Sequence, residues 1–468
     1  MIIFLAAAAL ATAAPTASPT PASALPSISS GNALPYPAYG SPQPQIIQTR
    51  SEKGVPQTIT LDQATSIAIA RVPSLAAARA QVALEDAAVD QQRTALRPDL
   101  SISASGTHYF YQGGNGPGVV GLDASGQVNT ASLALAQLIY DGGQVRAKIE
   151  AASLTRDATL ATYRRDAQTV AYDVAQAYYT VLDDERTVAV DDQLLAQDIV
   201  SENLVRAQIR AGTEAGADLA SQIATTANAR TTLVKAQGTL QNDRVVFATA
   251  LGLDADIDVL PIDDTQGLET STPANTLPAY GSALDIAYVE RPDYEEARLT
   301  IGSNQASLRA AQRGLSPTLS LAAAKGISSS DIGGGAYLNN ADVGLDIKIP
   351  LYDQGMTRAN VASSRANVDI AKANAATARL TVQQDVRQAL IAIVSDRSTL
   401  DQTRTAYQAA LVSLRSTQSQ YRVGVSTLPA LIQAEATLAS AATNIVNAIY
   451  ALRLAESNLR FALGTILQ

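Results

Sequence analysis

Two hydrophobic patterns alternate along the chain. In long alanine-rich stretches, apolar residues recur every seven positions, and two such rows run side by side. The first row comprises Val361, Val368, Ala375, Val382 and Ala389, and the second comprises Val386, Ile393 and Leu400. A seven-residue spacing is typical of helices that pack along their length as coiled coils. The pattern therefore predicts long helices that need lateral partners.

Proline and glycine set the expected limits of these helices. The expected helical runs are 61–97, 144–210, 214–252, 356–422 and 426–463. Pro98 ends the first run, whereas Pro429 falls in a first helical turn, where proline is tolerated. Gly212 and Gly424 each divide one long run from the next, which predicts two helical hairpins with tips at these glycines.

Between the helices, apolar and polar side chains alternate with a period of two, which predicts β-strands. We expect strands near 99–110, 127–140, 317–327 and 341–351, paired through loops rich in Gly, Asn and Ser. Strands of this length suit a tilted transmembrane strand, and aromatic residues flank both ends, but a half-buried soluble sheet fits the strands equally well. Four strands cannot close a barrel in lipid, whereas two chains would supply eight strands and three would supply twelve.

The two halves of the chain resemble each other. At an offset of 212, Tyr140 matches Tyr352, and Arg210 matches Arg422. This predicts an internal duplication, with repeats at 58–252 and 284–464 joined by an acidic linker at 253–283. Residues 1–24 are expected to be a secretory signal peptide, followed by a disordered Pro/Ser-rich leader at 25–57.

The amino-acid composition argues against most catalytic, metal-binding and nucleic-acid-binding sites. The chain has no cysteine, one histidine and a formal net charge of −9, so thiolate metal sites, disulfides and nucleic-acid binding are not expected. His108 has no second nitrogen ligand, and GPGVVG at 116–121 lacks the helix that a dinucleotide fingerprint requires. The acidic groups at 183–185 and 191–192 are expected to form a solvated helix face. We therefore expect neither an enzyme nor a cofactor or metal site.

Two nearly identical motifs, LIYDGG at 138–143 and PLYDQG at 350–355, mark the points where a strand gives way to a long helix. The candidate junction residues are Tyr140, Asp141, Gly142, Gly143, Pro350, Tyr352, Asp353 and Gly355. The aspartates can cap the following helix, and the glycines allow the chain to turn. The difference between Leu138 and Pro350 suggests that the two junctions bend differently.

From 58 to 464 this arrangement resembles the TolC-like outer membrane efflux proteins. The duplicated unit, the Tyr-Asp-Gly-Gly-like junctions and the Gly-containing tips carry the resemblance. It implies a homotrimer in which a 12-stranded outer-membrane β-barrel, with four strands per chain, continues into a long periplasmic α-helical barrel. It also implies passive conduction, with a periplasmic adaptor (membrane fusion) protein and an inner-membrane pump of antiporter or ATP-binding type as partners.

The resemblance also assigns residues at the hairpins. The adaptor-docking tips would be Arg210, Ala211, Gly212, Thr213, Arg422, Val423, Gly424 and Val425, and the periplasmic gate would comprise Asp218, Tyr421, Ser426, Ala430 and Gln433. The second tip departs from the family pattern, because Ala430 and Gln433 stand where acidic residues form a cation-attracting ring. Ser426 replaces the usual basic residue, so a salt bridge from Asp218 to that position is not available.

The leading hypothesis is an exit duct of a tripartite efflux or type I secretion system in the outer membrane. The alternative is a secreted, flagellin-like coiled-coil filament protein, which would also be rich in Ala, Gln and Ser and free of cysteine.

Overall fold

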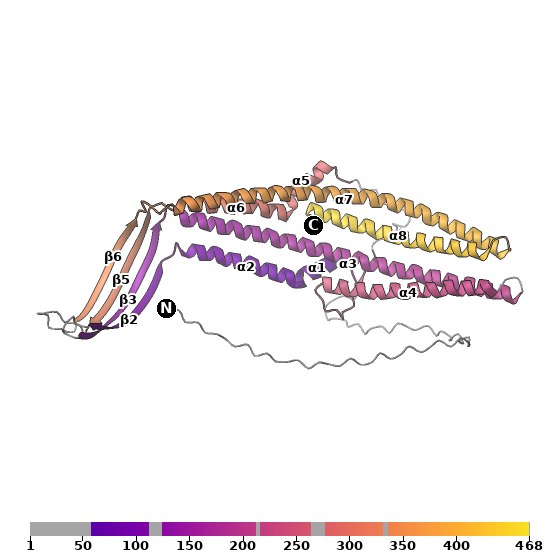
Figure 1. Cartoon of the computed structure of the whole chain (residues 1–468), viewed down its shortest axis with the longest axis horizontal. Helices are drawn as coiled ribbons and strands as arrows, with labels where there is room; N and C mark the ends of the chain where they lie inside the picture. The colour runs from indigo at the N-terminus through magenta and orange to yellow at the C-terminus, as the bar shows by residue number, and fades with distance from the viewer. Residues whose placement is uncertain (1–57, 112–123, 212–215, 264–276, 331–335, 468) are drawn as a thin grey trace, which may run out of the picture. The chain divides into compact units, whose positions relative to one another are not determined.

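The structure is a computed structural model that describes residues 58–111, 124–211, 216–263, 277–330 and 336–467 (Figure 1). The expected signal peptide (1–24) and leader (25–57) lie outside these residues. The loops between paired strands, the first hairpin tip at 212–215 and part of the acidic linker also lie outside them.

The described elements follow the same order twice: two short helices, two strands, a helix of 67 residues, and a helix of 35 or 36 residues. The first half contains β1 (Thr58–Ile59), α1 (Leu61–Arg71), α2 (Pro73–Thr94), β2 (Asp99–Tyr111), β3 (Ala124–Tyr140), α3 (Gln144–Arg210), α4 (Gly216–Ala250) and β4 (Leu260–Pro261). The second half contains α5 (Tyr280–Glu290), α6 (Pro292–Gln312), β5 (Thr318–Ser330), β6 (Ala336–Lys348), α7 (Met356–Arg422) and α8 (Leu428–Leu463).

The expected single helical run at 61–97 is wrong in one respect, because it divides at Val72 into α1 and α2. Val72 is extended (φ −62°, ψ 122°), and Pro73 stands in the first turn of α2. A residue that precedes proline avoids the helical region, whereas proline itself needs no hydrogen-bond acceptor at a helix start. Arg291 and Pro292 produce the same break between α5 and α6.

The four long strands form one antiparallel sheet in the order β2-β3-β5-β6, so β2 and β6 are its two edges. On one face, the hydroxyl of Ser103 lies 2.9 Å from that of Ser132, and the hydroxyl of Ser105 lies 2.7 Å from that of Thr130. The last strand ends at Lys348 rather than at the expected position 351. Pro350 explains this early end, because it has no backbone N–H to donate to a ladder.

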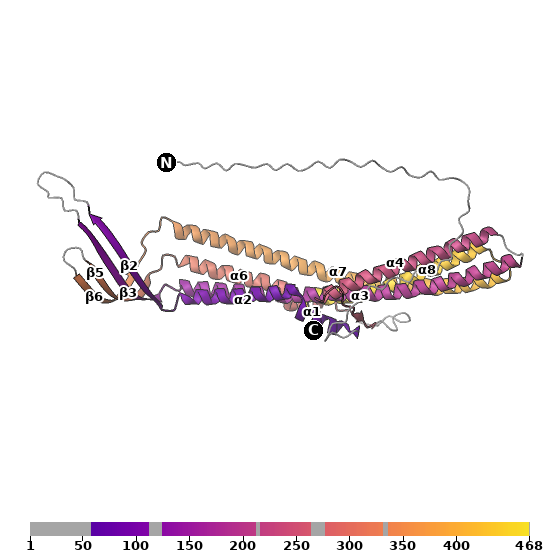
Figure 2. The same cartoon turned by 90° about the horizontal axis from the view of Figure 1, so that it is seen from below.

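The long helices pack side by side within the unit formed by residues 48–468. Contacts between neighbouring helices give the order α2-α3-α6-α7 in the part nearer the sheet and α4-α3-α8-α7 in the part nearer the hairpins (Figures 1 and 2). Both heptad rows predicted on α7 face this packing. Val368, Val382, Ala389, Val386, Ile393 and Leu400 are buried, and Val361 and Ala375 are half-buried.

Among the described residues, no single helix is long and apolar enough to cross a membrane. The bent pair formed by α1 and α2 passes the same test when taken together, by length and composition only.

Candidate functional site

The first junction is a capped turn between β3 and α3. The carboxylate of Asp141 accepts hydrogen bonds from the backbone N–H groups of Gly143, at 2.9 Å, and Val145. These N–H groups at the helix start have no partner inside the helix, so the aspartate satisfies them and its charge suits the positive helix end. Gly142 and Gly143 both have left-handed φ angles, +69° and +87°. A Cβ on Gly142 would lie 2.4 Å from the Cβ of Ser316, so this position also requires glycine for space.

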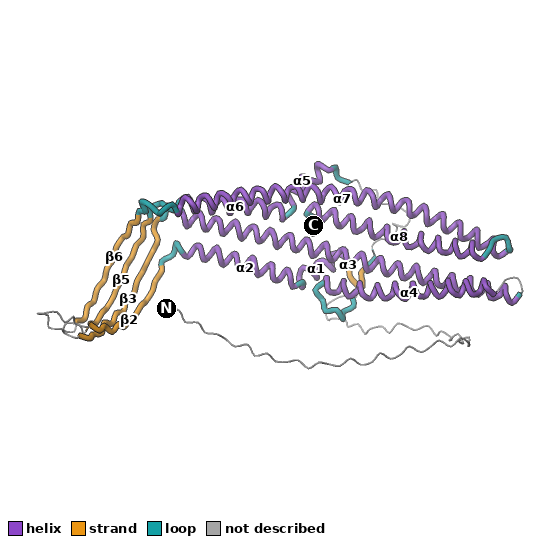
Figure 3. Tube along the Cα trace, in the orientation of Figure 1, coloured by secondary structure: helices purple, strands orange, loops and turns teal. Residues whose placement is uncertain are grey.

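The second junction, between β6 and α7, has the same kind of cap; Figure 3 draws the segments between the strands and the long helices as loops and turns. Asp353 accepts hydrogen bonds from the N–H groups of Gly355, at 3.1 Å, and Thr357, at 2.6 Å. The hydrogen bonds from Thr357 hold the pKa of Asp353 below its ordinary value. Gln354 has φ +60°, matching Gly142, and is the one described non-glycine residue with a positive φ. Gly355 has φ +87°, the same value as Gly143.

The two junctions differ in the chain that enters them. β3 runs through a register shift at Leu138–Tyr140 directly into its Asp cap. β6 instead stops at Lys348, and a non-strand segment containing the half-buried Pro350 covers the remaining distance. Tyr140 and Tyr352 are both exposed at the sheet-to-helix boundary. The helix caps are therefore alike, whereas the strand ends are not.

The second hairpin tip presents two exposed valines around a left-handed glycine. Val423 and Val425 are 74% and 77% exposed, and Gly424 has φ +75°. The N–H of Val425 donates to the carbonyl of Gln420 at 2.9 Å, which closes the end of α7, and Arg422 is exposed in its last turn. The tip therefore offers a small apolar surface on a defined backbone.

The first tip is described only on its flanks. Arg210 is the exposed last residue of α3, and Ala211 caps the helix by donating to the carbonyl of Ala207 at 3.0 Å. Gly212 and Thr213 lie outside the described residues. Asp218 is half-buried in the first turn of α4, where a negative charge is favourable, and we observe no ion pair for it in the described part of the chain.

Tyr421 joins the ends of α7 and α3. Its side chain is 2% exposed, it packs with Val205 and Leu428, and its hydroxyl donates to Gln208 Oε1 at 2.9 Å. Both partners of this hydrogen bond are uncharged side chains. Ser426 is half-buried, whereas Ala430 and Gln433 are exposed on α8.

A buried polar cluster near the hairpins was missed from the sequence. Ser201 on α3 donates to Glu435 Oε1 on α8 at 2.7 Å, and Glu435 is 5% exposed. Together with Asp191 and Asp198 from α3, Glu435 lines a cavity of about 150 Å³ between α3, α4 and α8. Burial raises the pKa of Glu435, and the charge of Asp198 adds to the shift. The contact between Ser201 and Glu435 spans 234 positions of sequence, and neither residue belongs to a local motif.

The acidic run at 183–185 is not a solvated face, which corrects the expectation from sequence. All three residues are half-buried, because α3 at this point passes through a core that includes Tyr178, Leu182 and Phe247. Burial raises the pKa of Asp183 to about 6. Burial and a hydrogen bond with Asp243 raise the pKa of Asp184 to about 7. In the second acidic group, Asp191 is buried and Asp192 is exposed.

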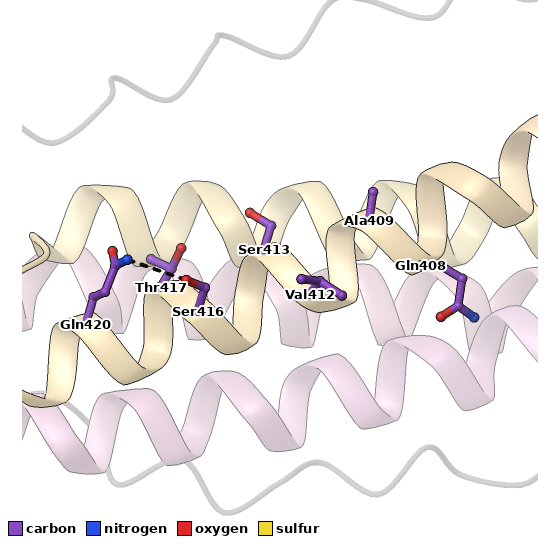
Figure 4. A pocket seen from close by; sticks show the side chains of 7 residues that line it. All are labelled: Gln408, Ala409, Val412, Ser413, Ser416, Thr417 and Gln420. Carbon is purple, nitrogen blue, oxygen red and sulfur yellow. Dashed lines mark hydrogen bonds between the residues drawn. The ribbon is translucent and has the colours of Figure 1, made fainter.

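A shallow groove runs along α7 towards the second tip. Small and polar side chains line it, and all of them come from this one helix (Figure 4): Gln408, Ala409, Val412, Ser413, Ser416, Thr417 and Gln420. Gln420 Nε2 donates to the hydroxyl of Ser416 at 3.4 Å. No group of three or more His, Cys, Asp or Glu residues in the described ranges could hold a metal ion.

Paired long helices that end in hairpins, joined by capped turns to a four-stranded sheet, define a protein of the outer-membrane efflux class. The family model described as "Outer membrane efflux protein" matches residues 64–253 and 283–465, well over half of the sequence, and the chain belongs to this family. Members of the family are outer-membrane channels with a large periplasmic helical portion, and not enzymes. The family assignment removes the support for a secreted filament.

The chain is similar to outer membrane protein TolC of Escherichia coli (strain K12), with 27% identity over 412 residues, covering 83% of this chain and 79% of that protein. It is also 24% identical over 378 residues to outer membrane efflux protein BepC of Brucella suis, covering 80% and 78% of the two chains. Among solved structures, the CmeC outer membrane channel of Campylobacter jejuni matches with a TM-score of 0.74 and 18% identity, covering 87% of this chain and 86% of CmeC. A membrane protein from Pseudomonas aeruginosa matches with a TM-score of 0.75 and 21% identity, covering 86% and 93%. The structural likenesses establish the fold.

Proposed function

We propose that this protein is the outer-membrane exit duct of a tripartite efflux or type I secretion system. Three copies would join their sheets into a 12-stranded barrel and their helices into one periplasmic tube. Substrates would pass through it passively, delivered by an inner-membrane pump through a periplasmic adaptor. The two halves would be products of an internal duplication, and residues 1–24 would be removed as a signal peptide.

The observation that carries this proposal is that the row of long helices ends on two different helices, α7 on one side and α4 on the other, and that both expose apolar side chains. On α7, Met356, Ile370, Ile391 and Val412 are exposed at spacings that are multiples of seven residues, and the exposed Leu380 and Val394 lie three positions later in the heptad. This is a second coiled-coil seam, separate from the buried one. On the opposite edge, α4 exposes Ile223, Val234 and Val245 at intervals of eleven residues. One edge of each copy can therefore receive the other edge of the next, which is a ring-forming contact.

The sheet also has two different open edges, β2 and β6. β2 and β6 are 13 residues long and are paired on one side only, and such edges are not tolerated in lipid. One sheet face carries exposed Leu100, Ile102, Val343, Leu345 and Ile347, as a lipid-facing surface requires. Pairing of β6 with β2 of the next copy would remove every edge.

The hairpin ends would serve as the gate and the adaptor-docking surface. α3 and α7 each span 67 residues, about 100 Å at 1.5 Å per residue, so the tips stand far from the sheet. The exposed Val423 and Val425 provide apolar docking contacts, and the Tyr421–Gln208 bond would hold the second hairpin against α3 in the closed state. Because Ala430 and Gln433 are uncharged, we propose that the constriction lacks a strong cation-attracting ring.

Replacing both tip glycines tests the function. Gly424 has φ +75°, and its N–H donates to the carbonyl of Tyr421, so proline fits neither its angle nor its hydrogen bond. We expect the double variant Gly212→Pro/Gly424→Pro to reach the outer membrane at normal levels but to lose most export of a fluorescent efflux substrate from whole cells. The matched control is Gly238→Ala on α4, where a Cβ meets no neighbouring atom, and it should export normally. Unchanged export by the proline variant would refute docking and gating at the tips.

A further inference from the structure

We propose that Lys325 binds a phosphate group of an outer-leaflet lipid headgroup, which gives each chain one lipid-binding site on the sheet. This proposal goes beyond the exit-duct function and rests on the proposed placement of the sheet in the outer membrane. The reasoning begins with the way charges are distributed over the two sheet faces.

The four strands of the sheet contain five charged residues: Asp99, Asp342, Asp346, Lys348 and Lys325. Side chains alternate between faces along a strand, and directly paired residues share a face. From the strand register, the first four lie on the face that carries the Ser103–Ser132 and Ser105–Thr130 pairs. Lys325 alone lies on the apolar face.

The neighbours of Lys325 on that face are apolar. It pairs with Leu133 on β3 and with Ala341 on β6, and Ile102 lies beyond Leu133 in the same row. Towards the helices, the next row on this face consists of Leu100, Leu135, Ala323 and Val343. Lys325 is exposed, and we find no carboxylate paired with it among the described residues. The adjacent Asp342 belongs to the opposite face.

The position of Lys325 along the strands indicates where its ammonium group lies. The next row away from the helices consists of Ala104, Ala131, Ile327 and Asn339. The row after it contains Asn129, Ser329 and Tyr337. Lys325 therefore lies near the outer end of the apolar band, one row from Asn339 and two rows from the polar and aromatic row of Asn129, Ser329 and Tyr337. A lysine in this position can extend its alkyl chain along the apolar surface and bring its charge to the headgroup level.

The side of the membrane follows from the fold. The helices leave the sheet at the end occupied by Tyr140 and Pro350, and the helical portion is periplasmic in this family. The row containing Asn129 and Tyr337 is at the other end, so Lys325 faces the outer leaflet. In the described part of the chain, Lys325 is a single cation with apolar surroundings and no carboxylate partner. This matches a lipid with acyl chains and a phosphate, because the apolar face can contact the acyl chains and the ammonium group can bind the phosphate.

Lipid binding by the purified protein in dodecyl maltoside tests the proposal. Native mass spectrometry would compare diphosphoryl lipid A with a fully dephosphorylated form of the same acyl chains. We expect the wild type to prefer the diphosphoryl lipid, Lys325→Gln to bind it about fivefold more weakly, and Lys325→Arg to retain binding. Lys348→Gln is the matched control, since it removes the one other lysine of the sheet from the opposite face, and it should bind as the wild type does.

Equal binding of the diphosphoryl lipid by wild type and Lys325→Gln would overturn the proposal, as would an equal loss in Lys348→Gln. Competition by millimolar inorganic phosphate would show a free-anion site instead of a lipid site and would also overturn it. The assay reports lipid affinity alone. A failure of the exit-duct function would instead appear as lost export in a protein whose lipid preference is intact.

Discussion

The two 67-residue helices, α3 and α7, are built alike but occupy different places in the chain. Each follows a left-handed glycine and an aspartate cap, and each ends on an arginine at a hairpin tip. α3 has neighbours on both sides, with α2 and α4 on one and α6 and α8 on the other. α7 contacts α5, α6 and α8 and leaves a heptad seam of Ile370, Leu380 and Ile391 exposed. Two helices of the same length and with the same caps therefore occupy an interior position (α3) and an edge position (α7). Their exposed side chains distinguish the two positions.

The largest expected effect comes from charging the exposed seam of α7. In the double variant Leu380→Glu/Ile391→Glu, six carboxylates would enter the contacts of a trimer, where they would be desolvated without partners. We expect self-association to be lost and the native mass in mild detergent to fall to that of a monomer, as measured by light scattering coupled to size exclusion. Gln388→Glu, also exposed on α7 but beside the seam, should leave the mass unchanged. A native mass unaffected by the double variant would mean that α7 is not an edge that joins copies.

Smaller effects on stability, opposite in sign to each other, are expected from substitutions just before the two long helices. Gly142→Ala places a side chain at φ +69° and against Ser316, so it should destabilise the protein by ~2 kcal/mol. Gln354→Gly at the matching position before α7 relieves a left-handed non-glycine residue and should stabilise by ~0.5–1 kcal/mol. Thermal unfolding followed by circular dichroism measures both changes. Two changes of the same sign would show that the junctions are not equivalent turns.

An effect smaller than that of Gly142→Ala is expected from half-buried acids, and it depends on pH. The pKa of Asp184 on α3 is raised from 3.8 to about 7 by burial and by Asp243, so its ionisation opposes folding. Stability from this group is present below the unfolded-state pKa and is lost as pH rises through about 7. Asp184→Asn should therefore raise stability by ~1–2 kcal/mol at pH 8, with allowance for partial solvent exposure, and change it little at pH 4. Asp396, its counterpart on α7, has a pKa raised by burial alone, so Asp396→Asn should have a smaller effect in the same pH scan. An equal effect of the two variants would contradict the difference in environment.

Sequence patterns predicted the elements that depend on local chemistry. The limits of α3 and α7 coincide with the expected 144–210 and 356–422, because a glycine turn begins each helix and a glycine tip follows it. The buried row of Val382, Val386 and Ile393 also lies where the seven-residue spacing placed it. The break at Val72 was not predicted, although Pro73 restricts the backbone of the residue before it.

The features that escaped prediction depend on contacts between distant segments. The burial of Asp183 and Asp184 depends on which helices surround α3, and a single helix face does not reveal this. Ser201 and Glu435 meet only when α3 packs against α8. At the candidate gate, the sequence identified Tyr421 through a family resemblance, whereas its partner Gln208 became visible only in the structure.

The unlike edges of the chain have a consequence for assembly. A contact between two different surfaces does not limit the number of copies that can join, so the angle between the α7 edge and the α4 edge determines the count. If each copy contributes one third of a circle to the helical tube, the third copy contacts the first and no further copy can join. A smaller turn per copy would give a ring of more copies, or an assembly that does not close into a ring. In the proposed trimer, the curvature set by the small alanine contacts between the helices would therefore determine both the width of the duct and the number of its subunits.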